Sequence, residues 1–229
     1  MSVSAILSKY TDAVPRQLEA FDVIAGFLSE ESKKYNLTAL HDEHDVAMLH
    51  FYDSLTVAKM ISGKVIDIGC GAGFPSLPLA VYRPDCTVTM LDSTRRKVEF
   101  AATAARLSGT ENVKALCGRA EELSRLPEHR ETYDTAVSRG VAALNILCEW
   151  ALPFVRVGGL FIAMKGRAGR EEAERSAHAL EVLGGEIRVI TDAEIPETDH
   201  IHTLITIKKT RPTPPQYPRS NAVTGKRPL

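Results

Sequence analysis

Three glycines at alternate positions stand where an apolar run stops: residues 65–75 read VIDIGCGAGFP, with Gly69, Gly71 and Gly73. Glycines this dense cost conformational entropy on folding, so something is expected to approach the bare backbone closely. An apolar strand, a glycine loop and then a helix open the nucleotide-binding half of a doubly wound sheet. The loop is therefore predicted to bind a ligand.

Two carboxylates indicate which ligand. Asp67 lies two residues before Gly69, and Asp92 ends the next apolar run, 23 residues after Gly69. An acidic residue at the end of the second strand, where Asp92 stands, accepts the hydroxyls of a ribose. A carboxylate at Asp67 would repel a pyrophosphate but attract a sulfonium, and the third glycine comes one place too early for a dinucleotide site. These features favour S-adenosylmethionine over NAD.

The third predicted strand is followed by CGRAEE at residues 117–122. In a doubly wound sheet this segment lies beside the adenine of the cofactor, with Ala120 and Glu121 nearest the base. For Glu122, capping of the following helix explains the residue equally well.

Two cations stand at later strand ends, each next to a glycine: Arg139 and Lys165. Their place above the cofactor favours a role in the reaction. The turn SRGV lacks both the Asp/Asn-Pro-Pro-aromatic pattern of amino-group methylation and the Pro-Cys nucleophile of C5-pyrimidine methylation. A ring nitrogen or an oxygen is therefore the predicted acceptor.

Guanine N7 carries a lone pair and no proton, so it needs no general base, and catalysis reduces to positioning and desolvation. Arg139 is then assigned to guanine O6 or an RNA phosphate. The alternatives are ribose 2′-O methylation with Lys165 as the base, a small-molecule methyltransferase, and a ribosome-associated binding protein without catalysis.

Seven short runs rich in Val, Ile, Leu and Thr predict strands at residues 64–69, 87–92, 113–118, 133–139, 159–165, 186–191 and 202–209. The first five are separated by segments long enough for crossover helices, which predicts an α/β fold with a mostly parallel, seven-stranded sheet of the Rossmann-like, class I methyltransferase type. Amphipathic helices are predicted over residues 15–34 and about 42–60. The predicted parts are a helical extension (1–62), the sheet domain (63–209) and a basic, Pro-rich extended arm (210–229).

Charge is unevenly distributed along the 229 residues. The net charge is −1, but residues 200–229 hold six cations and no acid, so that the rest of the chain carries −7. A basic tail on an acidic body suggests a polyanionic partner, and a solvated solubility tail is the alternative. Phosphate contact and base stacking are predicted for the tail at Lys208, Lys209, Arg211, Tyr217, Arg219, Lys226 and Arg227.

The four cysteines form no C-x-x-C pair, which argues against a disulfide scaffold and a zinc site. His41 and His44 have no evident third ligand, so no metal site is predicted. The chain lacks a basic-then-apolar leader and an apolar run of about 18 residues, and a cytoplasmic location is predicted.

Taken in order, these motifs resemble the ribosomal RNA small subunit methyltransferase G family, also called glucose-inhibited division protein B. The resemblance extends over nearly the whole chain and is carried by YNLT at 35–38, HFYDS at 50–54, DIGCGAGFP at 67–75, LDS at 91–93, AEE at 120–122, SRG at 138–140, MKG at 164–166, and YPR at 217–219 with KRPL at 226–229. His202 departs from the arginine that is frequent in the family.

The resemblance implies methylation of guanine N7 in a decoding-region loop of bacterial 16S rRNA, with S-adenosylmethionine as donor and the RNA or the 30S subunit as partner. It also implies a monomeric cytoplasmic enzyme with cofactor contacts at Gly69, Phe74, Ala120, Glu121 and Arg139.

Three residues of the N-terminal part are further candidates for substrate contact, Asn36, His50 and Asp53. His50 and Asp53 share a helix face, which favours contact of both with the substrate, and a hydrogen bond between them that docks the helix on the sheet is an equally good alternative. Asn36 has a comparable alternative as the cap of a turn.

Overall fold

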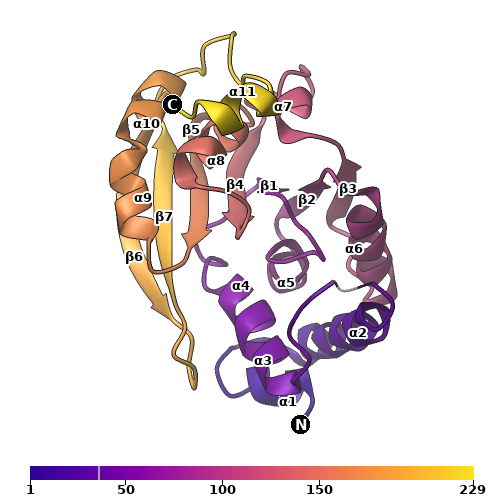
Figure 1. Cartoon of the computed structure of the whole chain (residues 1–229). Coiled ribbons are helices and arrows are strands. Elements are labelled where there is room, and N and C mark those ends of the chain that lie inside the picture. The colour runs from indigo at the N-terminus through magenta and orange to yellow at the C-terminus, as the bar shows by residue number, and fades with distance from the viewer. Residues whose placement is uncertain (36) are drawn as a thin grey trace.

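A seven-stranded sheet forms the centre of the computed structural model, which describes residues 1–35 and 37–229 (Figure 1). The strands follow the order β3-β2-β1-β4-β5-β7-β6. Their bounds are β1 Lys64–Ile68, β2 Thr87–Asp92, β3 Val113–Cys117, β4 Tyr133–Arg139, β5 Val155–Lys165, β6 Gly185–Glu194 and β7 Ile201–Lys209. The predicted fold class is confirmed, and each predicted strand is present within four residues of its expected bounds.

The strand directions follow from the connections. Neighbours among β1 to β5 are parallel because helical crossovers join them, whereas β7 pairs antiparallel with both β5 and β6. The six residues between β6 and β7 form a hairpin loop, too short for a crossover. In the parallel part, Ile68 of β1 pairs with Leu91 of β2, so that the carboxyl ends of these central strands finish at one edge.

Helices cover both faces of the sheet. On one face α2 (Pro15–Ser32) packs on α5 (Ser76–Tyr82) and α6 (Arg95–Leu107), and on the other lie α8 (Leu144–Ala151), α9 (Gly169–Arg175) and α10 (Ala177–Leu183). Strand β1 is buried on both faces. Val65 belongs to the hydrophobic cluster that includes residues of α5, while Ile66 and Ile68 belong to the cluster that includes residues of α8. Alternate side chains on a strand point to opposite faces.

The N-terminal part is helical, as predicted, but its second helix is not uniform. Residues predicted as one helix over about 42–60 form α3 (Glu43–Asp45), a π-helical stretch η1 (Val46–Tyr52) and α4 (Asp53–Leu55) before turns. A short helix that the sequence did not indicate, α1 (Val3–Leu7), precedes α2 and buries Val3, Ile6 and Leu7. None of the helices in the described residues is long and apolar enough to cross a membrane.

Residues 210–229, expected as an extended arm, lie against the body and include α11 (Asn221–Lys226), which contacts α8 (Figure 1). Arg130, near α7 (Ala120–Leu123), donates from Nη2 to the Thr213 carbonyl at 2.9 Å and from Nη1 to the Tyr217 carbonyl at 3.0 Å. Buried Glu149 on α8 binds the Arg219 guanidinium at 2.6 and 2.8 Å. These contacts anchor the segment to the body of the protein.

Candidate functional site

A cavity of about 610 Å³ opens at the carboxyl ends of the central strands. Its size lies in the range of small-molecule sites. Eight of the residues predicted for the site line it: His50, Gly69, Gly71, Phe74, Asp92, Ala120, Glu121 and Arg139. Residues separated by up to 89 positions in the chain thus meet in one hollow, where ligands of doubly wound folds bind.

The glycine loop is bare where it faces this cavity. Gly69 and Gly71 have φ angles of +79° and +56°, a region that favours glycine. A Cβ added to Gly71 would meet nothing within 4 Å, so the backbone there borders open space. Gly73 serves packing instead: it does not line the cavity, and an added Cβ would lie 2.4 Å from the Leu77 side chain.

Asp92 is tied to the loop and still has capacity to bind a ligand. Its Oδ2 accepts the Gly71 N–H at 3.0 Å, and its Oδ1 accepts the Thr94 N–H at 2.8 Å. A carboxylate offers about four acceptor positions, so each oxygen has one left for another donor. Two fixed oxygens with free lone pairs suit two adjacent hydroxyl groups.

Asp67 lies under the loop rather than on the cavity wall. It is fully buried, and its Oδ2 accepts both the hydroxyl of Ser76 at 2.5 Å and the Ser76 N–H at 3.2 Å. Burial raises the pKa of Asp67 to about 7, and these hydrogen bonds oppose the rise. Its Oδ1 has no protein partner. The structure thus shows Asp67 joining β1 to the start of α5, which holds the loop between them.

Arg139, at the end of β4, is held by the N-terminal helical part. Its Nη1 lies 2.5 Å from Oδ2 of buried Asp53 and donates to the Leu49 carbonyl at 3.1 Å. The other oxygen of Asp53 lies 2.7 Å from Nδ1 of His202 on β7. In place of the hydrogen bond considered between His50 and Asp53, the Asp53 carboxylate contacts Arg139 on β4 and lies next to His202 on β7, where the two close atoms are not aligned for a hydrogen bond.

His50 is a neutral ring in the cavity wall. It stacks on Phe74 with ring centroids 4.6 Å apart and planes 18° apart, and its Nε2 lies 2.7 Å from the Thr38 hydroxyl. Burial, and then the charge of Arg139, lowers the pKa of His50 to about 4. The guanidinium Nη2 of Arg139 lies 3.4 Å from Nδ1. Because guanidinium only donates, this contact favours the tautomer with the proton on Nε2.

Two predicted cations lie outside the cavity wall. Lys165 is 8% exposed, and its Nζ donates to the Ala142 carbonyl at 2.6 Å and lies 2.8 Å from Glu172. Lys209, predicted to contact RNA, is fully buried: its Nζ donates to the Leu152 carbonyl at 2.7 Å and lies 3.1 Å from Glu131. Burial lowers the pKa of Lys209 to about 8. Both amines hold the fold together in this structure.

The remaining candidates for RNA contact divide into two groups. Lys208, Lys226 and Arg227 are exposed, as is Arg211, which donates from Nη2 to the Glu181 carbonyl at 2.7 Å. Half-buried Tyr217 and Arg219 contact each other and are engaged in anchoring residues 210–229. Asn36 lies outside the described residues.

Several lining residues were not identified from the sequence, among them Lys97 and Trp150, whereas Arg119 falls in the segment 117–122 that was expected beside the adenine. Lys97, in the first turn of α6, carried a usable signal, because it closely follows a predicted strand end. Trp150 had none: it comes from the end of α8 and contributes a buried indole N–H without a protein acceptor.

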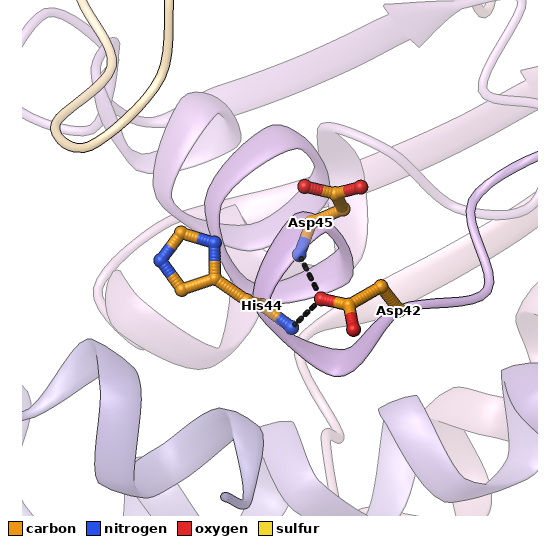
Figure 2. Close-up of side chains that lie close together, drawn as sticks. All are labelled: Asp42, His44 and Asp45. Atoms are coloured by element: carbon orange, nitrogen blue, oxygen red, sulfur yellow. Dashed lines mark hydrogen bonds between the residues drawn. The ribbon is translucent and has the colours of Figure 1, made fainter.

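A cluster of possible metal ligands lies at the start of α3. Ligand atoms of Asp42, His44 and Asp45 come within 4.8 Å of one another. Figure 2 shows the Asp42 carboxylate turned to the backbone, accepting the N–H groups of His44 at 2.8 Å and Asp45 at 3.3 Å, while the His44 ring points away from both carboxylates. His44 Nε2 lies 2.9 Å from Glu197. A helix cap and a surface ion pair account for the cluster.

Comparison with solved structures shows the fold. The O-methyltransferase from Bacillus cereus, solved in complex with SAH, matches with a TM-score of 0.63 at 16% identity, over 90% of this chain and 97% of that chain. The O-methyltransferase TomG from Streptomyces achromogenes, solved with SAM, matches with a TM-score of 0.59 at 16% identity, over 91% and 96%. At 16% identity these matches show the fold alone.

Comparison with known sequences is more specific. Ribosomal RNA small subunit methyltransferase G of Deinococcus deserti is 44% identical over 216 residues, 93% of this chain and 88% of the relative. The protein of the same name from Deinococcus radiodurans is 42% identical over 222 residues, 95% and 87% of the two chains. Residues 17–201, which include every described lining residue, match the family of rRNA small subunit methyltransferase G. This chain belongs to that family.

Proposed function

We propose that the chain transfers a methyl group from S-adenosylmethionine to N7 of a guanosine in bacterial 16S rRNA. The observation that carries the proposal is the cavity at the carboxyl ends of β1, β2 and β4, where Gly71, Asp92 and Arg139 meet in a member of this family. The enzyme acts as a cytoplasmic monomer on the RNA or on the 30S subunit.

The described residues fit the cofactor. The free lone pairs of Asp92 suit the two ribose hydroxyls, and the open backbone at Gly71 gives room for close approach. Ala120 and Glu121, at the start of α7 on the same wall, suit the adenine. When bound, S-adenosylmethionine supplies an electrophilic methyl group on a sulfonium.

Two side chains that could serve an oxygen acceptor as general base, His50 and Lys165, are already engaged in the fold, which supports a ring nitrogen as acceptor. Among the described lining residues, His50 is neutral but already paired with Thr38. Lys165, the base required for ribose 2′-O methylation, is bound to Ala142 and Glu172 away from the wall. Guanine N7 needs positioning and exclusion of water, which a partly enclosed apolar wall at Phe74 supports.

RNA approaches over the rim of the cavity in this proposal. Lys97 and Arg119 are exposed there and suit phosphate groups, while Arg139 faces the cavity next to the place of the base. Lys226 and Arg227 remain exposed on the anchored C-terminal segment and suit more distant phosphates. Such contacts predict activity that falls as salt is raised.

The test is methylation of undermethylated 30S subunits with labelled S-adenosylmethionine, followed by mass spectrometry of the nucleosides. We expect label in 7-methylguanosine from 16S rRNA. The matched control is Asp92→Asn, which should bind cofactor weakly and give little product. Label in a 2′-O-methylated nucleoside, or in no nucleoside while the cofactor binds, would contradict the proposal.

A further inference from the structure

We propose that Asp53 is a positioning residue that neutralises Arg139, so that the cavity accepts a donor and a product that both carry a positive charge. The inference rests on the proposed function and adds a residue to it. Asp53 does not line the cavity. Asp53 acts on the cavity through the guanidinium of Arg139, which does line the cavity.

The contact between the two residues is close and shielded. Asp53 is 1% exposed, the Arg139 side chain is 14% exposed, and Nη1 lies 2.5 Å from Oδ2. In the described residues, Arg139 has no other carboxylate within salt-bridge distance. Its remaining acceptors are the backbone carbonyls of Leu49 and His50 and the neutral His50 ring. Asp53 is therefore the carboxylate that contacts Arg139 directly, while the charge of Arg139 reaches buried Asp67 from further away.

The reaction keeps a positive charge in the cavity throughout. The N7 lone pair forms the bond to the methyl carbon while the electron pair of the carbon–sulfur bond passes to sulfur. The sulfonium becomes a neutral thioether, and the guanine ring becomes a 7-methylguanine cation. An uncompensated guanidinium in the wall would repel the positive charge that is present both before and after the methyl transfer. This repulsion is strongest where water is excluded, so a neutralising carboxylate has its largest effect there.

The other buried carboxylate near the loop is a weaker source of compensation. Asp67 is held by hydrogen bonds from Ser76, and burial raises its pKa to about 7 although these hydrogen bonds and the charge of Arg139 oppose the rise. Asp92 is 9% exposed and already accepts two backbone N–H groups on the far side of the loop from β4. Asp53 differs from both because its oxygen contacts the cation itself.

A purely structural role is the rival explanation, since Asp53 also joins α4 to His202 on β7. The two roles are distinguished by comparing S-adenosylmethionine with S-adenosylhomocysteine. These ligands share adenosine and the amino-acid group and differ by one methyl and one positive charge. A distorted wall weakens both equally, whereas an unbalanced charge weakens the sulfonium ligand selectively.

The experiment is calorimetric titration of both ligands into the wild-type chain, Asp53→Asn, Arg139→Gln and the double variant. All titrations are run at one pH and one ionic strength, so that the four chains are compared under the same conditions. We expect Asp53→Asn to lower the affinity for S-adenosylmethionine relative to S-adenosylhomocysteine roughly tenfold, the effect of a unit charge about 10 Å away at an effective dielectric constant near 20. In the double variant the ratio of the two affinities should return to within about twofold of wild type.

Equal losses for the two ligands in Asp53→Asn, or a ratio that the double variant does not restore, would overturn the inference. If Asp53→Asn does not fold, Arg139→Gln alone decides the question. Removing the cation and leaving the carboxylate should shift the ratio towards the sulfonium ligand, and an unchanged ratio refutes the charge role. Failure of the wild-type chain to bind either ligand would instead count against the proposed function.

Discussion

Replacing Asp92 by Asn tests where the ribose lies. The amide keeps one acceptor oxygen but turns an NH₂ group towards either Gly71 N–H or Thr94 N–H, which the carboxylate now accepts at 3.0 and 2.8 Å. The variant therefore loses at least one charge-assisted bond to a hydroxyl. Such a bond contributes about 2 kcal/mol, so we expect roughly a 30-fold loss of affinity for S-adenosylhomocysteine.

The same substitution also disturbs the loop, and a second ligand separates the two effects. The wild-type chain and Asp92→Asn are titrated with S-adenosylhomocysteine and with its 2′,3′-dideoxy analogue. If Asp92 binds the ribose hydroxyls, the penalty of the substitution should shrink to within about threefold for the analogue, since no hydroxyl remains to be lost. An equally large penalty for both ligands would show that Asp92 acts through the loop and would refute its assignment to the ribose.

Three further predictions concern the loop, the stacked histidine and the C-terminal segment. Gly71→Ala and Gly109→Ala place a methyl in open space at φ +56° and +67°, so each should lose about 1–2 kcal/mol of stability in urea unfolding, but Gly71→Ala alone should also lose cofactor affinity in titration. His50 has a pKa of about 4 in the folded chain against an ordinary 6.5, so the unfolded chain takes up the proton first as pH falls. Stability should therefore drop between pH 6.5 and 4 by up to about 3 kcal/mol more than in His50→Gln, measured by urea unfolding; equal slopes would contradict this. Glu149→Gln leaves Arg219, whose side chain is 24% exposed, without its buried carboxylate, and should cost about 2 kcal/mol and speed tryptic cleavage of residues 210–229; unchanged cleavage would argue against the anchor.

The sequence predicted the cavity well because strand ends are marked by local pattern. Asp92 and Arg139 each close an apolar run, and in a parallel sheet such positions meet at one edge. Gly69 and Gly71 could be placed for the same reason, since the loop follows β1 directly, whereas Gly73 packs against Leu77. Local residue order alone was sufficient to bring these groups together.

Burial of the lysines was harder to predict. Alternation along β7 did contain a signal for Lys209, which shares parity with buried Ile205 and Ile207 and therefore points to the same interior. Lys165 gave none, because both faces of β5 are buried at its end. A charged residue at a strand end can belong to a functional site or can form a buried ion pair that stabilises the fold. The spacing of residues in the sequence cannot distinguish these two roles.

Pairings between distant segments could not be predicted at all. Asp53 was considered with His50, its neighbour by helical spacing, but it contacts Arg139 and His202, 86 and 149 positions further along the chain. The anchoring of the basic tail could not be predicted from the sequence for the same reason, because its partners Arg130 and Glu149 come from distant elements. Composition records how many charges a segment has, and tertiary packing decides which of them are free.

The π-helical stretch η1 has a consequence for how this protein tolerates change in length. Its wide turn brings the Leu49 carbonyl, the His50 ring and, directly after it, Asp53 to one guanidinium on β4. Each residue of an ordinary helix advances about 100° around the axis. Shortening residues 46–52 by one would relax the stretch to that ordinary winding and rotate every side chain before it away from the sheet. Homologues are therefore expected to exchange side chains in this stretch while keeping its length constant.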